Sequence, residues 1–574
     1  MDTNALQQLR SEYEHHKSSR ANVEATWDQI EKFVDPLGNG SLAVESDHES
    51  SVMWKRTDVW DFTAIQGSKK LKATIHGTLT NPAVQWFTAE FRDVEMQKDQ
   101  AAREWLEDSI GRTYQALQDS DFNSEIPKDF GDLVDYGNGF IVCEGKSRGA
   151  WDGLDFTSVP VREGYYEPDS VGGVRKFFRR MDWSARQIVG HFDGENIPEN
   201  IRDEADRTDG LEATHEVVFC VFPREGVAPA TVDSDGNDIV LSPEKRPFGS
   251  VYFLAATAEQ VGLDDGYYDF PAFHSPWDET SGSQWGHGVG GLVLPTVKLL
   301  NALWETYLGA AEKAVDPGGF VSDRAGVSAM DLGPGKWTVA KGELDKIFKV
   351  IESGARFDVT IDLLSQLQGM IRRAFHEDEL QLKDSPAMTA TEAAIRFEIM
   401  NRVMGSTLAL VTSRQLVPIL RLVMAMLRRE GQLKPMPESL KRSKGEINIV
   451  FLGPLARAQR TDEVSAIERG FSFAAQARKM GFEEAADYFN AGEAMREVLK
   501  RLGVPATCVR SQEEAAAAIK ARKDAIAAAQ AAELARARGE AAEQAGLAGQ
   551  ALRAAGTQPG PAAPPPMLTP TLEG

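Results

Sequence analysis

The stretch MTATEAAIRFEIMNRVMGSTLALVTSRQLVPILRLVMAMLRREG, residues 388–431, is apolar at helical intervals along its whole length and decides the fold class. Thr389 and Glu392 have the spacing of a capping box, and Gly431 follows two arginines where a helix would end. At roughly 1.5 Å per residue such a helix spans about 60 Å, which is longer than a compact soluble domain needs. The sequence therefore predicts one long helix in a subunit of a larger assembly.

Two residues inside this helix predict a bend. Pro418 has no N–H to donate to the carbonyl of Arg414, and its ring clashes with that carbonyl. Gly405 further weakens the helix because glycine has more conformational freedom to lose. We therefore expect a kinked helix, with Gly405 and Pro418 as the residues of the kink.

Composition limits the partners and the compartment. The 574 residues, 42% apolar and 26% charged, have the balance of an ordinary soluble protein with several domains. The net charge of -23 excludes a chain that binds nucleic acid through an overall basic surface. Cys143, Cys220 and Cys508 are too far apart for a disulfide framework, which favours a reducing compartment. No signal-peptide pattern opens the sequence, and no run approaches the length of a membrane span, so we expect no membrane association.

The rest of the pattern predicts an α+β, mainly α, subunit. Apolar residues at helical spacing cover residues 6–34, 62–80 and 101–118, and short aromatic and β-branched runs separated by turns follow from about residue 132. A helix is expected to begin near Pro295, and a returning helix, with Leu363 and Leu364 in its buried stripe, covers 361–377. Between these two helices lies an insertion with strand-like segments and a short helix around 345–351.

The C-terminal third continues this pattern. A strand is expected at 446–452 and helices at 461–502. Residues 512–555 are so rich in alanine that they should form a helix which packs against copies of itself rather than filling a core. The Pro-rich end of the chain is expected to be disordered.

Nucleotide-binding motifs are weak in this sequence. The segment GPGKW at 333–337 has Trp where a Walker loop needs Ser or Thr, and it is better explained as a turn. Gly286, Gly288 and Gly291 do have the spacing of a dinucleotide-binding loop, but a polar loop precedes them instead of a buried strand. A dehydrogenase-like enzyme using these glycines remains an alternative that cofactor titration would test.

No catalytic or metal-binding constellation is apparent, so we expect no enzyme activity, no cofactor and no metal. The pair His15 and His16 is interpreted as an exposed helix face, and the cluster at 376–379 (HEDE) as a solvated charged loop. Asp264 and Asp265 before a glycine indicate a turn. Aromatic pairs occur along the β-rich region, and core packing explains them better than base stacking.

Several segments together resemble portal proteins, the head-to-tail connecting proteins of short-tailed bacteriophages. The resemblance extends over about residues 10–460 and does not depend on one motif. It is carried by Phe62-Thr63-Ala64 with the helix ending GTLTNPAVQWF, by Asp132-Leu133 with YGNGFIVCEG, by FHSPWDETSGSQWGHGVG with the helix LPTVKLLNALWETYLGAAEKAVDPG, and by MTATEAAIRFE with LVPILRLVMAML.

The resemblance implies a division of the chain into the parts of a portal subunit. These are an N-terminal helical wing (1–130), an α+β wing (131–288), stem helices (289–315 and 359–378) around a small β-containing clip (316–358), a tunnel loop (379–388), the long kinked wing helix (389–431), a wing and crown region (432–510), an Ala-rich helical crown (511–555) and a Pro-rich tail (556–574).

It also implies a function, in which a dodecameric ring at the unique capsid vertex of the virion forms the channel through which viral DNA is packaged and ejected. An acidic or neutral lining with few cations suits a conduit through which DNA slides. The residues implied to face DNA are Arg372, Arg373, Glu379, Gln381, Lys383 and Asp384.

The resemblance also implies partner proteins. Asp323, Arg324, Lys336 and Trp337 in the clip are implied to dock the terminase large subunit and the tail adaptor protein. Major capsid and scaffolding proteins are further partners, with internal ejection proteins as additional candidates, and assembly is expected in the host cytoplasm. The alternative from another class is an oligomeric virion structural protein without a channel.

Overall fold

The computed structural model describes the chain in two compact units, Met1–Ala494 and Met495–Gly574. The described residues are 2–36, 59–93, 96–97, 99–146, 151–170, 172–192, 196–207, 214–227, 241–279, 283–315, 319–321, 348–350, 357–377, 404–442, 447–452, 464–474, 476, 480, 492, 494–495, 498–499 and 512–554. Every sheet among them is antiparallel. The architecture is mixed helix and sheet, in agreement with the predicted α+β class.

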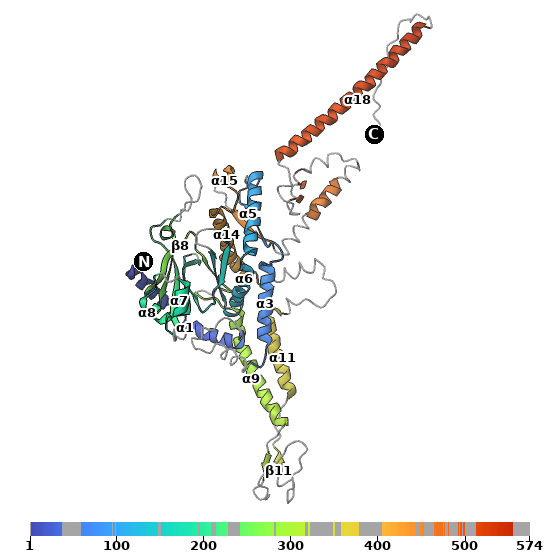
Figure 1. Ribbon diagram of the computed structural model, residues 1–574. Coiled ribbons are helices and arrows are strands. Elements are labelled where there is room, and N and C mark those ends of the chain that lie inside the picture. Colours follow the sequence, from blue (N-terminus) through green and yellow to red (C-terminus); the bar gives the residue numbers. More distant parts are fainter. Residues whose placement is uncertain are drawn as a thin grey trace. The chain divides into compact units, whose positions relative to one another are not determined.

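A five-stranded sheet lies in the first unit, where Figure 1 labels its strand β8. Its strands follow chain order: β4 (Gly164–Pro168), β5 (Val174–Ser184), β6 (Thr214–Pro223), β7 (Phe248–Leu254) and β8 (Gln260–Tyr267). Side chains alternate between the two faces of a strand. The first half of α1 (Thr3–Phe33) therefore packs on the face with Val218 and Cys220, while α7 (Ala185–His191) and α8 (Glu199–Ala205) cover the face with Val217 and Phe219.

A three-stranded sheet belongs to the main core, with β2 (Asn138–Gly145) between β3 (Leu154–Ser158) and β9 (Ala272–Pro276). Helix α6 (Phe122–Tyr136) leads into β2 through Gly137, whose φ of 87° lies in the left-handed region that favours glycine. Helices α3 (Thr63–Leu79) and α5 (Gln100–Gln118) complete this core. Strand β1 (Phe87–Phe91) pairs with β12 (Ile447–Phe451), which brings distant parts of the chain together, and α15 (Glu438–Arg442) precedes β12.

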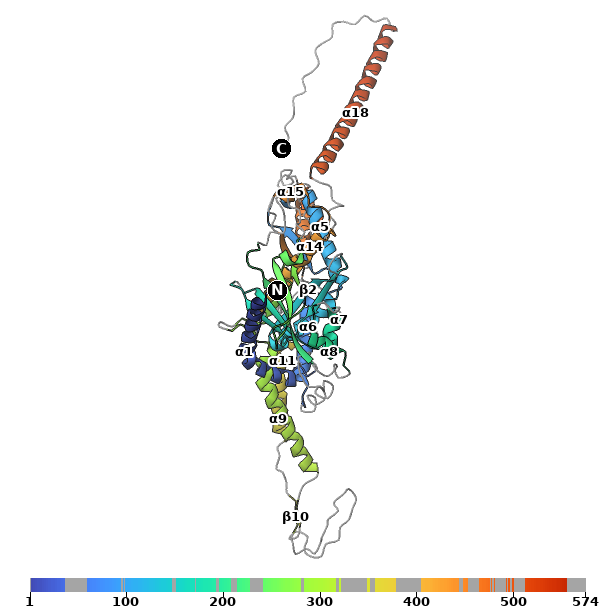
Figure 2. The same ribbon diagram turned by 60° about the vertical axis from the view of Figure 1, so that its left-hand side comes forward.

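Two helices of the first unit, α9 (Val289–Val315) and α11 (Phe357–Ala374), lie side by side in both views (Figures 1 and 2). Between them in sequence, β10 (Gly319–Val321) pairs with β11 (Phe348–Val350). The expected short helix around 345–351 is therefore wrong for the residues of β11, where pairing with β10 prevails over local propensity.

The long helix is described from Met404 to Arg429, and residues 388–403 lie outside the described part of the chain. It contains a π-helical turn, η3 (Thr412–Leu416), directly before α14 (Val417–Arg429). The N–H of Val417 donates to the carbonyl of Thr412, and Pro418, in the first turn of α14, has no N–H to donate. The irregularity thus lies next to Pro418, whereas Gly405 lies in regular α-helix.

This helix also corrects an expectation about membranes. Among the described residues, Met404–Arg429 is long and apolar enough by composition to cross a bilayer, although the sequence was interpreted as having no such segment. Core helices of soluble proteins have the same composition. Val411, Leu420 and Val423 are fully buried in the main core, as such a helix requires.

Other boundaries also differ from those predicted. Helix α9 begins at Val289, so Pro295 lies inside it rather than in its first turn. Helix α6 continues to Tyr136, past the predicted onset of strands at Asp132. Asp264 and Asp265 belong to β8 and not to a turn. Leu363 is exposed instead of joining the buried stripe of α11.

The second unit contains α18 (Gln512–Ala554), the predicted Ala-rich helix. Its side chains are exposed along nearly the whole length. The large apolar residues among them, Ile519, Ile526, Leu534 and Leu547, are at least half exposed.

Candidate DNA-facing surface around helices α3 and α11

A buried carboxylate joins α11 and α9 to the start of α3. Asp61 is only 6% exposed, and its Oδ1 accepts a hydrogen bond from the backbone N–H of Thr63 at 2.8 Å. Its Oδ2 accepts hydrogen bonds from Gln368 of α11 at 2.6 Å and from the indole of Trp304 of α9 at 3.3 Å. A carboxylate with three donors is well satisfied despite its burial. Asp61 therefore fixes the position of α3 relative to both helices of the pair.

Asn301 of α9 holds the same segment from the other side. Its Oδ1 accepts hydrogen bonds from the backbone N–H groups of Trp60 at 2.7 Å and Asp61 at 3.3 Å, and its Nδ2 donates to the carbonyl of Val297. The Asn301 side chain is buried, and both its amide oxygen and its amide nitrogen form hydrogen bonds. The chain thus enters α3 at a defined angle to the helix pair.

Helices α3 and α11 approach closely where α11 ends. A Cβ atom on Gly67 would lie 2.7 Å from the ring of Phe375, which is itself 1% exposed. The hydroxyl of Ser68 donates to Asp135 of α6 at 2.6 Å. Since glycine leaves room for the ring, α3 packs against α11 on one side and α6 on the other.

Four cations surround this contact and extend into solvent. Arg372 and Arg373, predicted to face DNA, are exposed on the last turn of α11. Arg373 donates from Nε to the carbonyl of Gly369 at 3.2 Å. Lys69 and Lys70 are exposed on α3, and Lys70 forms an ion pair with Glu377. A chain of net charge -23 therefore has a local basic surface, made by two helices about 300 residues apart in sequence.

Sequence reasoning missed the two lysines. The exposed residues of α3, Gln66, Lys69, Lys70, Ala73 and Gly77, form one stripe that contains no acidic residue. That stripe was available from the helical pattern. Its proximity to α11 was not, because it depends on the tertiary contact between Gly67 and Phe375.

Glu377 corrects the interpretation of residues 376–379 as a solvated loop. Its side chain is 8% exposed and lies between Lys70 and Arg372, whose Nε is 4.0 Å from Glu377 Oε2. His376 before it has a φ of 56°, in the left-handed region. Residues 376 and 377 thus close the end of α11 by an ion-pair contact with α3.

Glu379, Gln381, Lys383 and Asp384 lie outside the described residues, as do Asp323, Arg324, Lys336 and Trp337. Of the six residues expected to face DNA, only the two arginines are described.

A buried acidic cluster lies behind this surface, on α6. Burial raises the pKa of Asp135 to about 6, although Lys72 of α3 pairs with it at 2.6 Å. For Lys72, burial would lower the pKa, but the carboxylates of Asp135 and Asp35 outweigh it and raise the pKa. The ion pair therefore fastens α3 to α6 behind the exposed lysines.

Asp129 joins α6 to the long helix. Burial raises its pKa to about 7, opposed by the 2.7 Å hydrogen bond that Gln415 donates to Oδ2. Asp129 Oδ1 and Gln415 Oε1 are buried without a hydrogen-bond partner in the described structure. Burial also raises the pKa of Asp132 well above its ordinary value. The hydrogen bond between Gln415 and Asp129 connects α6 to the π-helical turn.

The loop with dinucleotide-like glycines is filled by protein. A Cβ atom on Gly288 would lie 2.6 Å from the amide nitrogen of Gly137. Asn138 Oδ1 accepts hydrogen bonds from the N–H of Gly286 at 2.9 Å and from His274 Nε2 at 3.1 Å. Burial lowers the pKa of His274 to about 3, so the ring is neutral and donates from Nε2. The glycines allow α9 to pack on the end of α6, and backbone atoms of this contact occupy the space next to Gly286 and Gly288 that a pyrophosphate would need.

His15 and His16, which were considered from the sequence as metal ligands, lie on α1. His15 is exposed as expected, but His16 is half-buried, and burial lowers its pKa. Within the described ranges, no group of three or more His, Cys, Asp or Glu side chains is arranged to hold a metal ion.

The first unit thus combines two long packed helices, α9 and α11, with an antiparallel strand pair, β10 and β11, that lies between them in sequence. The family model for the bacteriophage head to tail connecting protein matches residues 6–509, and the chain belongs to this family. The sequence-based recognition of a portal or connector protein is thereby confirmed. Family membership assigns the chain to the head–tail junction of a virion and to no known class of enzyme.

Two relatives illustrate this similarity. The chain is 22% identical over 475 residues to the "Probable portal protein" of Bordetella phage BPP-1, covering 80% of this chain and 81% of that protein. It also matches a chain of the solved structure "Neck of native GTA particle computed with C12 symmetry" at 11% identity, covering 71% of this chain and 86% of that chain. The TM-score of the second match, 0.29, is too low to indicate a shared overall fold.

Proposed function

We propose that the chain is a portal subunit, copies of which close into a ring around a channel for viral DNA at the capsid vertex. The observation that carries this proposal is the apolar surface of the helix pair. Leu292 and Leu299 of α9 are 73% and 51% exposed, and Ile361 and Met370 of α11 are each 53% exposed. A subunit that functions alone would bury or replace such residues. Packing between neighbouring copies would cover them, as a ring requires.

The proposed channel wall includes the exposed lysines of α3 and the last turn of α11. Lys69, Lys70, Arg372 and Arg373 would place positive charge against the phosphates. The net charge of -23 would keep the remainder of the subunit from binding DNA tightly. Few cations in an acidic wall allow a duplex to be centred and still to slide.

The proposed docking surface for the terminase and the tail adaptor is the part of the chain between α9 and α11. Only β10 and β11 of this part are described, and they form an antiparallel pair beyond the ends of the two long helices. Capsid, scaffolding and ejection proteins would contact other surfaces. Deleting residues 320–340 should abolish both dockings while the remaining chain still folds, and retained adaptor binding would refute the assignment.

Electron microscopy of the purified, concentrated protein tests the central proposal. End-on class averages should show rings with a central hole, and a dodecamer is the expected count. Rings without a hole would instead support a structural virion protein that has no channel. Monomers or dimers at every concentration would contradict the portal role.

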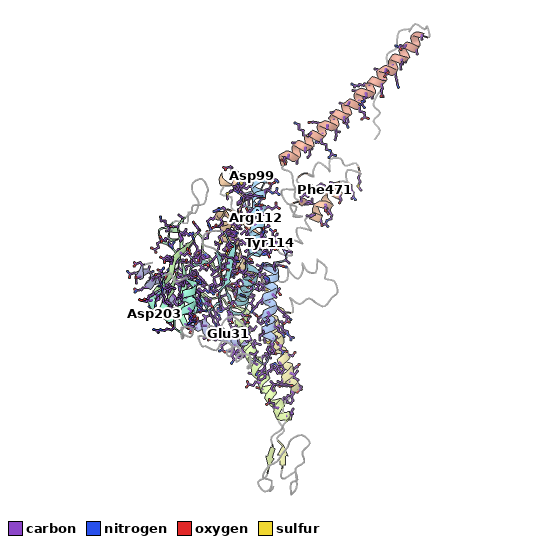
Figure 3. The ribbon with its side chains drawn as sticks, in the orientation of Figure 1. Glu31, Asp99, Arg112, Tyr114, Asp203 and Phe471 are labelled. Atoms are coloured by element: carbon purple, nitrogen blue, oxygen red, sulfur yellow. The ribbon has the colours of Figure 1, made fainter. Side chains whose placement is uncertain are left out.

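The DNA contacts need a separate measurement. Changing Arg372, Arg373 and Lys383 together to glutamine should reduce packaging and genome retention while rings still form. Arg112, exposed on α5 and labelled in Figure 3, provides a control arginine away from this surface. If the triple variant packages and retains DNA as the unaltered protein does, these residues do not guide the duplex.

A further inference from the structure

A hollow separate from the α3 and α11 surface lies between α14, α5 and the β1–β12 pair. Its volume is about 620 Å³, which falls in the range of specific binding pockets. Arg421, Met424, Ala425 and Arg428 line it from α14, spaced so that they share one face of that helix. The opposite face of α14 is buried in the main core. The hollow is therefore built on a rigid element.

The floor of the hollow is apolar, and its charged lining residues are arginines. Trp105 of α5 is 6% exposed and donates from its indole to the carbonyl of Lys434, so the ring is held in one orientation. Ile447 and Ile449 of β12 and Met436 contribute further apolar surface. Arg92, Arg421 and Arg428 add three guanidinium groups, and the described lining contains no Asp, Glu or Lys.

This composition indicates the kind of partner. Protein interfaces are enriched in Trp, Met and Arg and depleted in Lys, Asp and Glu. Methionine adapts its shape to an inserted apolar side chain, and guanidinium groups bind carboxylates with two parallel hydrogen bonds. A nucleic-acid backbone would use the cations but leave the apolar floor uncovered. The lining thus complements a peptide that is both acidic and apolar.

We propose that this hollow is a docking site for an acidic segment of another protein, which inserts an apolar side chain beside Trp105 while a carboxylate pairs with Arg421. Only the hollow and its charge carry this inference, which is independent of the DNA channel. The bound segment would lie along α14 and contact both β12 and α5. Its site is distinct from the α3 and α11 surface and from the strand pair between α9 and α11.

The test uses the full-length protein and a fluorescein-labelled amphipathic peptide with leucine anchors flanked by glutamates. Arg421→Glu should weaken its binding at least about tenfold, by replacing attraction with repulsion. Ala425→Trp fills the hollow without a change of charge and should weaken binding by a similar factor. Arg112→Gln lies outside the lining and should leave the affinity unchanged. Circular dichroism of each variant checks that it remains folded.

Three results would overturn the proposal. The first is equal affinity for both pocket variants and the unaltered protein. The second is equal binding of a matched peptide in which lysines replace the glutamates. The third concerns occupation by a second copy of this chain. If Ala425→Cys is shielded from a thiol reagent in the assembled protein but labelled after dissociation, the hollow is a contact between copies and not a docking site for another protein.

Discussion

Arg20 is the most deeply buried cation of the described chain, and its geometry explains why only arginine suits the position. Its Nη1 donates to the carbonyls of Val161 and Gly164 at 3.0 and 2.6 Å, and Nη2 donates to that of Arg162. The guanidinium lies 3.6 Å from the ring centroid of Tyr165. Burial lowers the pKa of Arg20, yet guanidinium stays charged at any physiological pH. One side chain thus joins α1 to the segment that leads into β4.

Replacing Arg20 with lysine should destabilise the fold. Lysine keeps the charge, but its single ammonium cannot reach three carbonyls and stack on Tyr165 together. Lost hydrogen bonds to buried carbonyls should cost about 2–4 kcal/mol of unfolding free energy. Urea denaturation of Arg20→Lys measures this loss, and Arg112→Lys on the exposed face of α5 is the matched control. An equal loss of unfolding free energy in both variants would show that the buried hydrogen bonds of Arg20 do not contribute to stability.

Asp129 should make stability depend on pH. Its folded pKa of about 7 lies above the ordinary value of 3.8, so its stabilising contribution is fully present below pH 3.8 and lost as the pH rises through 7. Asp129→Asn stays neutral, and its amide can donate to the unpartnered Oε1 of Gln415. We expect the stability advantage of the variant over the unaltered protein to be small below pH 3.8 and to grow by about 2–3 kcal/mol between pH 5 and pH 8.

Melting temperatures from pH 5 to 8.5 test this prediction. Asp203→Asn, an exposed carboxyl on α8, is the control and should leave the pH profile unchanged. Parallel pH profiles for Asp129→Asn and the unaltered protein would mean that Asp129 does not hold its proton.

At the scale of elements, the π-helical turn beside Pro418 determines which side chains of the long helix reach the buried acidic cluster on α6. The turn places Gln415, which is fully buried, against Asp129 of α6. Arg414 in the same turn donates to the carbonyl of Gly172 and pairs with Glu279 at 2.5 Å. A regular α-helix would rotate these side chains by part of a turn. The π-turn therefore sets which residues of the long helix face the core.

Pro418→Ala should move this turn toward regular α-helix, because alanine restores an N–H that can donate to the carbonyl of Arg414. The contact of Gln415 with Asp129 should then weaken, the helix should straighten, and the fraction of closed rings should fall. Electron microscopy of the variant, with Ser413→Ala as control on the exposed face of the same turn, measures both changes. Normal rings with an unchanged π-turn would show that Pro418 does not determine the local geometry.

Local periodicity predicted most helices of this chain but not α6. Asp129, Asp132 and Asp135 occupy its inward face at successive turns, where Asp129 and Asp135 are fully buried and Asp132 is half-buried. They interrupt the apolar stripe by which a helix is recognised. Their environment depends on Lys72 and Gln415, which belong to other elements. No window of sequence around α6 contains those partners.

Long-range pairing limited the prediction of strands and of the site in the same way. β1 was missed because its partner is the distant β12, and β11 is a strand only through its three-residue pairing with β10. Arg372 and Arg373 were identified through the family resemblance, whereas Lys69 and Lys70 depended on how α3 packs. The dinucleotide-like glycines had a recognisable spacing, but only the contact with Gly137 shows that they serve packing.

At the scale of the whole molecule, charge and exposed apolar surface have opposite effects on association between copies. The net charge of -23 opposes association between copies through general repulsion. The proposed ring would therefore depend on local apolar contacts that outweigh this repulsion. The exposed residues of α9 and α11 are suited to that role. They lie on two packed helices that are connected in sequence through the β10–β11 pair, and α11 carries Arg372 and Arg373 in its last turn.

Polar substitutions on the helix pair should weaken ring formation without unfolding the subunit. Burying one such leucine or methionine contributes about 1.5–3 kcal/mol, so Leu299→Ser with Met370→Ser should lower the association constant at least about a hundredfold. Sedimentation velocity over a range of concentrations measures the shift from rings to free subunits.

The matched control is Leu263→Ser on β8, where a leucine of similar exposure, 55%, lies away from α9 and α11. It should leave the sedimentation profile unchanged, since loss of one exposed leucine does not by itself alter folding or charge. If the double variant forms rings at the same concentration as the unaltered protein, the helix pair is not an interface between copies. If Leu263→Ser weakens assembly equally, the contact between copies lies on the five-stranded sheet instead, and the channel would then have to be lined by other elements than α3 and α11.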